Sequence, residues 1–316
     1  MARLSYAERK QKKLERKRRR EEKTANALNI QNKLLTQADI KDMSTQQKIW
    51  IYTRTILIAA WPVIFYMFTP AICIAIGRVF LYASIYRDNK ETVSDAMNFY
   101  SFLGICLTLL TLHFVAKKKK TSVAKEATFS LKNLNFKYIL GMYGFGLCAS
   151  ISASAFLSLI PDSLMRGYDE MTNAAFSGYD VWFSCICILL LAPVTEEIIF
   201  RGYLLNRLLP LFKETASIWI VSILFAMFHL SIVWIVYGAL LGWIMAKISI
   251  RHDNIAYSLA IHLGFNAFSA INLLIMKTPV LANTLYCSKW MFLLYGVLFT
   301  GLGYWLYTIY RKEERL

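Results

Sequence analysis

The sequence is dominated by long apolar runs, several of them close to the length that a helix needs to cross a membrane. Hydrophobic residues make up 57% of the 316 residues, and charged residues make up only 18%. A soluble globular protein of this length carries more charge and fewer uninterrupted apolar runs. A membrane-spanning helix needs roughly 20 mostly apolar residues. We therefore predict an all-α fold, a polytopic bundle of transmembrane helices.

Eight segments of the chain have the composition of a membrane span. The fifth and sixth are nearly continuous, so that only a tight turn near residues 230–233 can separate them. We divide the chain into a basic cytoplasmic tail over residues 1–48 and one membrane domain over residues 49–316. The predicted spans lie near 55–77, 97–116, 138–160, 181–200, 216–231, 232–248, 255–276 and 290–310.

The distribution of basic residues predicts the orientation of this bundle. If the N-terminus is cytoplasmic, the connections on the inside carry 15 Lys and Arg, and those on the outside carry 6. This bias follows the positive-inside rule, and the lysine run 117–120 is its strongest anchor. We therefore expect both termini in the cytoplasm.

The N-terminal tail is strongly basic, with eleven Lys and Arg against four Glu in residues 1–24. Such a segment can bind anionic lipid head groups, although a charge run is often only a solvated tail that sets the topology. We expect membrane lipids, and no nucleic acid, as its partner. The tail lacks the apolar core of a signal peptide. We expect a multi-pass protein of a bacterial cell membrane rather than of an ER membrane.

Two adjacent carboxylates and an arginine lie at the end of the fourth apolar run. On a helix, Glu197 and Arg201 are four residues apart and can neutralise each other. Glu196 points about 100° away from Glu197 and has no such partner within the segment. Ionisable groups inside a span are costly and usually functional, so Glu196 is the candidate for chemistry. Pro193 removes a backbone donor beside them and can kink the helix.

Two histidines lie inside later apolar runs. His229 follows Phe225 by one helical turn, and His262 and Asn266 project together from another span because they are four residues apart. A single histidine of this kind is ordinarily an interhelical hydrogen-bond partner. Combined with Glu196, these groups are suited to activating water and stabilising an oxyanion in a site of low dielectric.

The same side chains can also bind a divalent metal, because imidazole and carboxylate together suit zinc. If a metal is bound, its expected ligands are Glu196, His229 and His262. The residues alone leave open whether the cofactor is zinc or none, and the metal-free scheme is only slightly preferred. The sequence has no CxxC motif that would indicate a separate structural metal site.

The three motifs, in this order and on successive apolar segments, resemble those of the CAAX-protease and bacteriocin-processing (CPBP, also called Abi) family of intramembrane endopeptidases. The resemblance covers about residues 180–270. It implies that Glu196 is the general base with His229 assisting, and that His262 and Asn266 hold the oxyanion. It implies that Glu197 and Arg201 fix the helix that carries the base. The substrate would be a membrane-associated peptide or protein, with lipidated or CAAX-type tails among the candidates.

Two other functions remain open at this stage. The family also includes regulators and bacteriocin-immunity proteins, so a non-catalytic scaffold is the main alternative to the protease. A transporter that uses the buried Glu and His side chains as an ion site ranks below both, because the two halves of the chain show no repeat.

Overall fold

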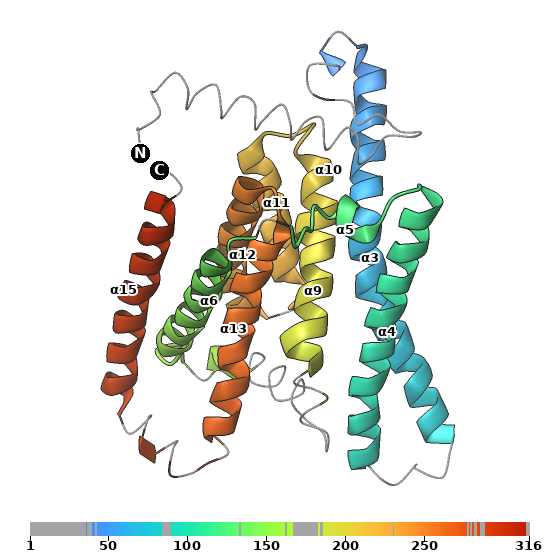
Figure 1. The fold of residues 1–316 in the computed structure, drawn as a ribbon. Helices are drawn as coiled ribbons and strands as arrows, with labels where there is room; N and C mark the ends of the chain where they lie inside the picture. The colour runs from blue at the N-terminus through green and yellow to red at the C-terminus, as the bar shows by residue number, and fades with distance from the viewer. Residues whose placement is uncertain are drawn as a thin grey trace.

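A computed structural model describes most of the membrane domain as a helical bundle (Figure 1). The described residues are 36, 40, 41, 43–83, 90–132, 134–161, 163–166, 183, 186–229, 231–276, 278, 280, 283, 284 and 288–313. Within them the regular secondary structure consists of helices, with no strand, as predicted. The basic run of the N-terminal tail lies outside the described residues.

The long helices follow the apolar runs of the sequence. They are α3 (Thr45–Ala83), α4 (Lys90–Lys118), α6 (Phe136–Leu157), α11 (Glu214–Met227), α12 (Ile232–His252), α13 (Ile255–Met276) and α15 (Lys289–Glu313). Short helices complete the bundle: α5 (Val123–Glu126), the π-helix η1 (Cys187–Leu191), α9 (Ala192–Glu196), the π-helix η2 (Glu197–Leu205) and α10 (Asn206–Leu208).

Four of these helices are long and apolar enough to cross a membrane, which confirms a membrane helix bundle. They contain the candidate spans Thr45–Phe80, Phe99–Lys118, Phe136–Leu157 and Ile232–His252. Two shorter apolar helices, Glu214–Met227 and Leu293–Leu306, have 10–17 residues. The predicted total of eight membrane spans is larger than these four and stays a prediction.

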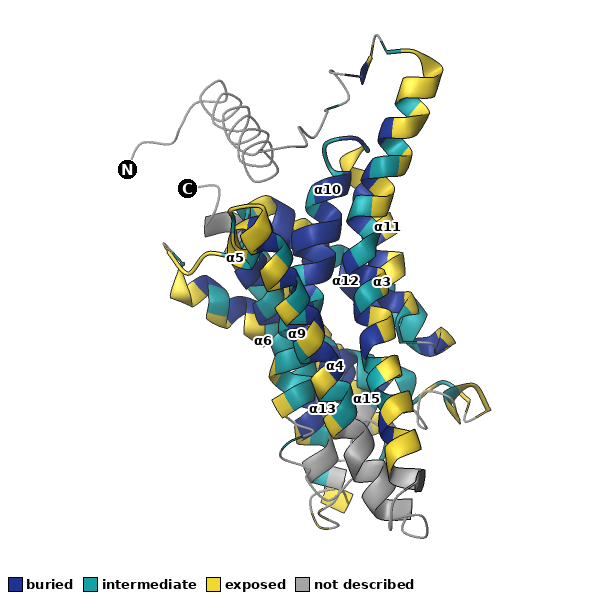
Figure 2. Cartoon of the chain, turned by 90° about the vertical axis from the view of Figure 1, so that its right-hand side faces the viewer, coloured by how far each residue is buried: buried dark blue, intermediate teal, exposed yellow. Residues whose placement is uncertain are grey.

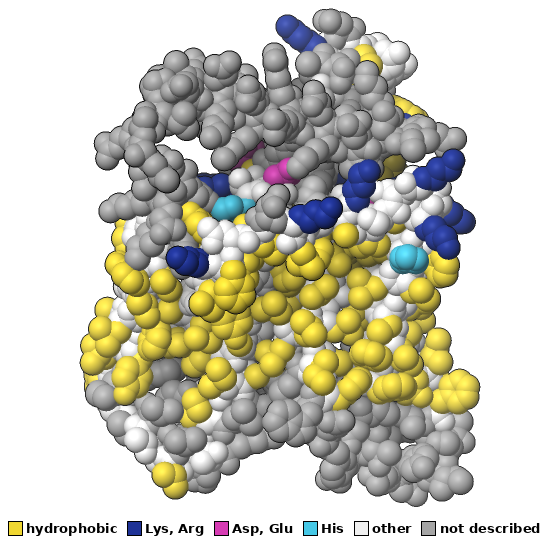
Figure 3. Space-filling view, in the orientation of Figure 1, with side chains coloured by type: hydrophobic (Ala, Val, Ile, Leu, Met, Phe, Trp, Pro, Cys, Tyr) yellow, Lys and Arg dark blue, Asp and Glu magenta, His cyan; other side chains and the backbone are white. Residues whose placement is uncertain are grey.

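The surface carries a broad hydrophobic belt (Figure 3). In this view the described Lys and Arg side chains lie along the upper edge of the belt or above it. The N-terminal end of α3 and the C-terminal end of α15 also lie towards this upper side (Figure 1). A shared side is what the positive-inside argument expects, and the cytoplasmic placement of that side stays a prediction.

The centre of the bundle is η2, which runs between α3 on one side and α11, α12 and α13 on the others. Its residues Ile199–Leu205 are all buried. The helix α10, which follows η2 directly, lies in a region coloured dark blue, for buried, in Figure 2. Close contacts between membrane helices rely on small residues. Gly242 of α12 faces Ser222 of α11, where an added Cβ would lie 3.2 Å from the nearest atom.

Candidate active site

The segment that carries the two glutamates is wound as alternating π- and α-helix. In η1 the N–H of Ala192 bonds to the carbonyl of Cys187, five residues earlier. In the same register the next donor would be residue 193, which is a proline and has no N–H. The side-chain amide of Asn266 in α13 instead donates to the carbonyl of Ile188, at 3.0 Å. π-helical turns occur frequently at functional sites.

Glu197 and Arg201 form the ion pair that their spacing predicts. Arg201 Nη1 donates to Glu197 Oε1 at 2.8 Å, and both side chains are fully buried. The guanidinium also lies 4.3 Å from the ring centroid of Phe225 and donates through Nη2 to the carbonyl of Gly242 at 3.4 Å. The pair therefore ties η2 to α11 and α12, and the charge of Glu197 is already compensated.

Glu196 differs from its neighbour in both partners and access. The hydroxyl of Tyr66, from α3, donates to Glu196 Oε1 at 3.0 Å. The second oxygen, Oε2, lies 3.6 Å from Nε2 of His262. The Glu196 side chain is 15% exposed, against 0% for Glu197. Of the two adjacent carboxylates, Glu196 is thus the one that a water molecule or a substrate can reach.

His262 lies between the two carboxylates. Its Nδ1 is 3.1 Å from Glu197 Oε1, and its Nε2 faces Glu196. The helix that carries it packs tightly on α6 through a reciprocal pair of glycines. A Cβ at Gly146 would lie 2.0 Å from the carbonyl oxygen of Ile261, and one at Gly264 would lie 2.0 Å from that of Tyr143. Backbone contact on both sides of His262 fixes the depth and rotation of its helix.

His229 lies just beyond the end of α11, in the turn before α12, and the predicted boundary between the fifth and sixth spans falls here. Its ring stacks on Trp234 with 4.2 Å between centroids. Phe225 touches the rings of His229 and His262, at centroid distances of 5.5 and 5.6 Å. Nδ1 of His229 is buried and has no hydrogen-bond partner among the described residues. Phe225 therefore lies between His229 and His262, and His262 in turn faces Glu196.

The structure therefore places the six predicted side chains on four neighbouring elements, and three of them, Glu197, Arg201 and His262, are buried. Glu196 ends α9, Glu197 and Arg201 lie in η2, His229 follows α11, and His262 and Asn266 lie in α13. The residue that the sequence did not single out is Tyr66, which α3 supplies to the site. A signal was available, because a tyrosine midway between Pro62 and Pro70 places a polar hydroxyl inside an apolar run.

The arrangement of these side chains can be compared with the needs of a metal ion. Zinc requires three or four protein ligands that converge on one point. In the part of the chain that the structure describes, no three His, Cys, Asp or Glu side chains are grouped so that they could hold a metal ion. Glu196, His229 and His262 thus do not form a ready-made group of three ligands, and whether the reaction uses zinc stays a prediction.

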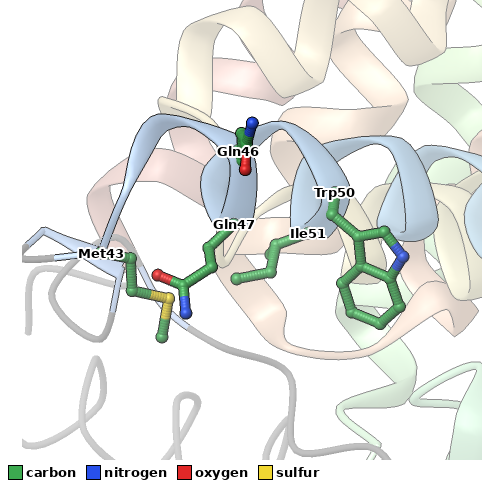
Figure 4. Close-up of a pocket in the computed structure, with 5 residues that line it drawn as sticks. All are labelled: Met43, Gln46, Gln47, Trp50 and Ile51. Carbon is green, nitrogen blue, oxygen red and sulfur yellow. The ribbon is translucent and has the colours of Figure 1, made fainter.

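A separate pocket lies at the N-terminal end of α3 (Figure 4), lined by Met43, Gln46, Gln47, Trp50 and Ile51. Along the helix, Ile51 is 15 residues before Tyr66, which corresponds to about 22 Å at 1.5 Å per residue. This pocket is therefore distinct from the glutamate and histidine cluster.

Comparison with known proteins agrees with the motifs. Residues 178–268 match a family model described as "Type II CAAX prenyl endopeptidase Rce1-like". The chain is also similar to the UPF0177 protein YbdI of Lactococcus lactis subsp. lactis (strain IL1403), with 28% identity over 182 residues. That alignment covers 56% of this chain and 94% of the relative. No solved structure matches the chain.

These matches confirm the resemblance to CAAX-type proteases that the three motifs predicted over about residues 180–270. The family match supports membrane protease activity. Glu196, Glu197, Arg201, His229, His262 and Asn266 all fall within the matched region.

Proposed function

We propose that this protein is an intramembrane endopeptidase in which Glu196 activates the attacking water. One observation carries the proposal: of two adjacent carboxylates, Glu197 is buried and paired with Arg201, while Glu196 is partly accessible and faces His262. A carboxylate without a cationic partner is energetically costly in an apolar bundle, and such groups usually have a function. A match to a protease family over the same residues supports this reading.

The reaction can be written with groups of this site. Glu196 takes a proton from water as the oxygen attacks the scissile carbonyl, and His229 helps to orient that water. The new C–O bond leaves a tetrahedral oxyanion, which His262 and Asn266 stabilise as donors. Collapse of this intermediate breaks the C–N bond. The proton held by Glu196 passes to the leaving amine, and the products are a carboxylate and an amine.

His262 and Asn266 already make hydrogen bonds within the protein, which limits the hydrogens that each can donate to an oxyanion. With Nδ1–H of His262 donating to Glu197, Nε2 can donate to an oxyanion only when the imidazole carries both protons. The Asn266 amide has two hydrogens, and the bond to Ile188 uses one of them. One donor hydrogen of Asn266 therefore remains for the substrate.

The position of the site supports a membrane-associated substrate. The cluster is enclosed by apolar helices, so the scissile bond must be near or within the membrane, in an extended and flexible part of a peptide. We propose cleavage near the C-terminus of a membrane-associated, lipidated or CAAX-type chain that approaches from the cytoplasmic side. Anionic lipids at the basic tail would keep the enzyme's inner face close to such substrates.

The main alternative is a non-catalytic scaffold, regulator or bacteriocin-immunity protein. It is favoured by the fact that Asn266 and His262 already have partners within the protein. In this case Glu196→Ala and His262→Ala would keep the biological phenotype, whereas changes on the surface of α6 or α12 would abolish it.

The proposal is tested by incubating the purified protein with lipidated and unlipidated peptides of one sequence, with and without a chelator. We expect cleavage of the lipidated peptide, with the same rate in both chelator arms and none in Glu196→Gln. Cleavage that persists in Glu196→Gln would overturn the role of Glu196. Cleavage abolished by the chelator and restored by zinc would overturn the metal-free mechanism.

A further inference from the structure

Tyr66 contacts the site from outside the region that the family match covers. The match begins at residue 178, whereas Tyr66 lies in α3, 130 residues before Glu196 in the sequence. Its hydroxyl donates to Glu196 Oε1 at 3.0 Å, and the residue is only 8% exposed. A buried tyrosine hydroxyl in an apolar environment needs an acceptor, and here that acceptor is the proposed general base.

The ring of Tyr66 is held independently of this hydrogen bond. It stacks on Phe228 with 5.7 Å between centroids and 16° between planes. Phe228 also meets Phe200 of η2 edge to face at 5.3 Å. Because Phe228 immediately precedes His229, the same tyrosine is in contact with the turn that carries the second proposed catalytic group. The hydroxyl can therefore be removed while the ring remains in place.

The backbone of α3 is shaped around this residue. Pro62 and Pro70 lie four residues before and after Tyr66. Pro70 lacks the N–H that would bond to the carbonyl of Tyr66, and a proline ring clashes with the carbonyl four residues before it, which favours a bend in the helix here. Gly104 of α4 lets the two helices meet at this point, since an added Cβ would lie 2.4 Å from Pro70 Cα.

A polar contact inside the span adds to this close packing. The hydroxyls of Thr69 and Thr108 are 2.6 Å apart and buried between α3 and α4. Such contacts hold neighbouring membrane helices in one register. The position of the Tyr66 hydroxyl is thus set by the packing of α3 on α4 and by the stacking of its ring on Phe228.

We propose that Tyr66 is a positioning residue for Glu196. It holds Oε1 as a hydrogen-bond acceptor and fixes the carboxylate plane, so that Oε2, beside His262, is the oxygen that takes the proton from water. This inference rests on the proposed endopeptidase function. A misplacement of a catalytic group by about 1 Å can cost roughly 100-fold in rate.

The kinetic test compares Tyr66→Phe with wild type on the peptide that the wild type cleaves. We expect kcat to fall at least about tenfold because the base is no longer held in position, with KM within twofold because the hydroxyl contacts the base and not the substrate. Tyr304→Phe is the matched control, since Tyr304 is exposed on α15, and it should behave as wild type. An unchanged kcat in Tyr66→Phe would overturn the positioning role, while Glu196→Gln separately tests the endopeptidase.

A second measurement does not depend on activity. Thermal unfolding of the detergent-solubilised protein is followed for Tyr66→Phe, Glu196→Leu and the double variant. Because Leu cannot accept the hydrogen bond, Tyr66→Phe should lower the melting temperature in the wild-type background and not in the Glu196→Leu background. Equal shifts in both backgrounds would mean that the two side chains do not interact, and would overturn the inference even if no peptide is cleaved.

Discussion

The side-chain amide of Asn266 donates a hydrogen bond to the carbonyl of Ile188. In the π-helical register of η1 this carbonyl would accept from the N–H of residue 193, which is a proline and has none. The proline and the asparagine are therefore parts of one arrangement, although they lie on different helices. In lipid an unsatisfied carbonyl costs several kcal/mol, so a backbone donor lost in one helix must be replaced from another. The helix beside the glutamates and the helix that carries His262 are joined by this replacement.

This relationship predicts that the effect of Asn266→Ala depends on residue 193. With Pro193 present, the variant leaves the Ile188 carbonyl without its donor and should lower the melting temperature by several degrees, as expected for about 1–3 kcal/mol. Pro193→Ala restores a backbone N–H, so Asn266→Ala should cost less stability in that background. Thermal unfolding of the four proteins in one detergent measures the coupling. Additive effects would show that Pro193 and Asn266 act independently.

The buried ion pair predicts a strong asymmetry between single and double variants. Glu197→Gln leaves the Arg201 charge buried among apolar side chains without its partner, which should cost about 3–5 kcal/mol. Arg201→Met leaves Glu197 unpaired and should cost a similar amount. The double variant removes both charges and should be more stable than either single one, as judged by thermal unfolding and expression yield. A double variant as unstable as the sum of the two would contradict this account.

The reciprocal glycine contact predicts that α13 cannot accept a methyl group where it meets α6. Gly264→Ala would place a Cβ 2.0 Å from the carbonyl oxygen of Tyr143, so the helices must separate and carry His262 away from the glutamates. Overpacking of this kind typically costs about 1–3 kcal/mol. Gly301→Ala is the matched control, because nothing lies within 4 Å of its added Cβ.

Both glycine variants should be compared by melting temperature and by peptide cleavage. We expect Gly264→Ala to lose stability and activity and Gly301→Ala to keep both. A Gly264→Ala protein with wild-type melting temperature and rate would show that α13 is free to move on α6.

A second buried ion pair predicts that the connection between α4 and α6 supports the same central helix. Arg207 Nη2 donates to Glu126 Oε2 at 2.8 Å, and both side chains are at most 3% exposed. Gly202 adds to this contact, since its Cβ would lie 2.5 Å from that of Ala127. Glu126→Gln should therefore destabilise the protein by about 3 kcal/mol or more. Glu214→Gln, at an exposed position at the start of α11, should have no measurable effect on the melting temperature.

The local part of the site could be predicted from the sequence, since it depends on helix geometry alone. The spacing of Glu197 and Arg201 predicted their contact, and the absence of a local partner singled out Glu196. The apolar runs predicted the membrane bundle, because the bilayer sets both length and composition. The gathering of His229, His262 and Asn266 was expected from the motifs and the family resemblance, and not from any measured distance.

Other features depend on how the helices pack, and the sequence does not display them. The contact of Tyr66 with Glu196 joins residues 130 positions apart, and only the bend and position of α3 bring them together. The π-helical register around Pro193 is another example, because a proline alone predicts a kink but not its form. The position of His229 is a third example. The sequence predicted it inside the fifth span, thirteen residues after the expected start of that span at Ala216. The structure ends α11 at Met227 and places His229 in the following turn, beside His262 through Phe225.

The role of Glu196 as the base of a peptide hydrolase can be tested by comparing the cleavage rates of three proteins. Initial cleavage rates of a lipidated peptide are measured for wild type, Glu196→Gln and Glu214→Gln, each purified in the same detergent and shown to have the same melting transition. Loss of a general base should lower the rate by about 10²–10⁴-fold in Glu196→Gln, while Glu214→Gln should match wild type. A Glu196→Gln protein that cleaves the peptide at the wild-type rate would contradict the account.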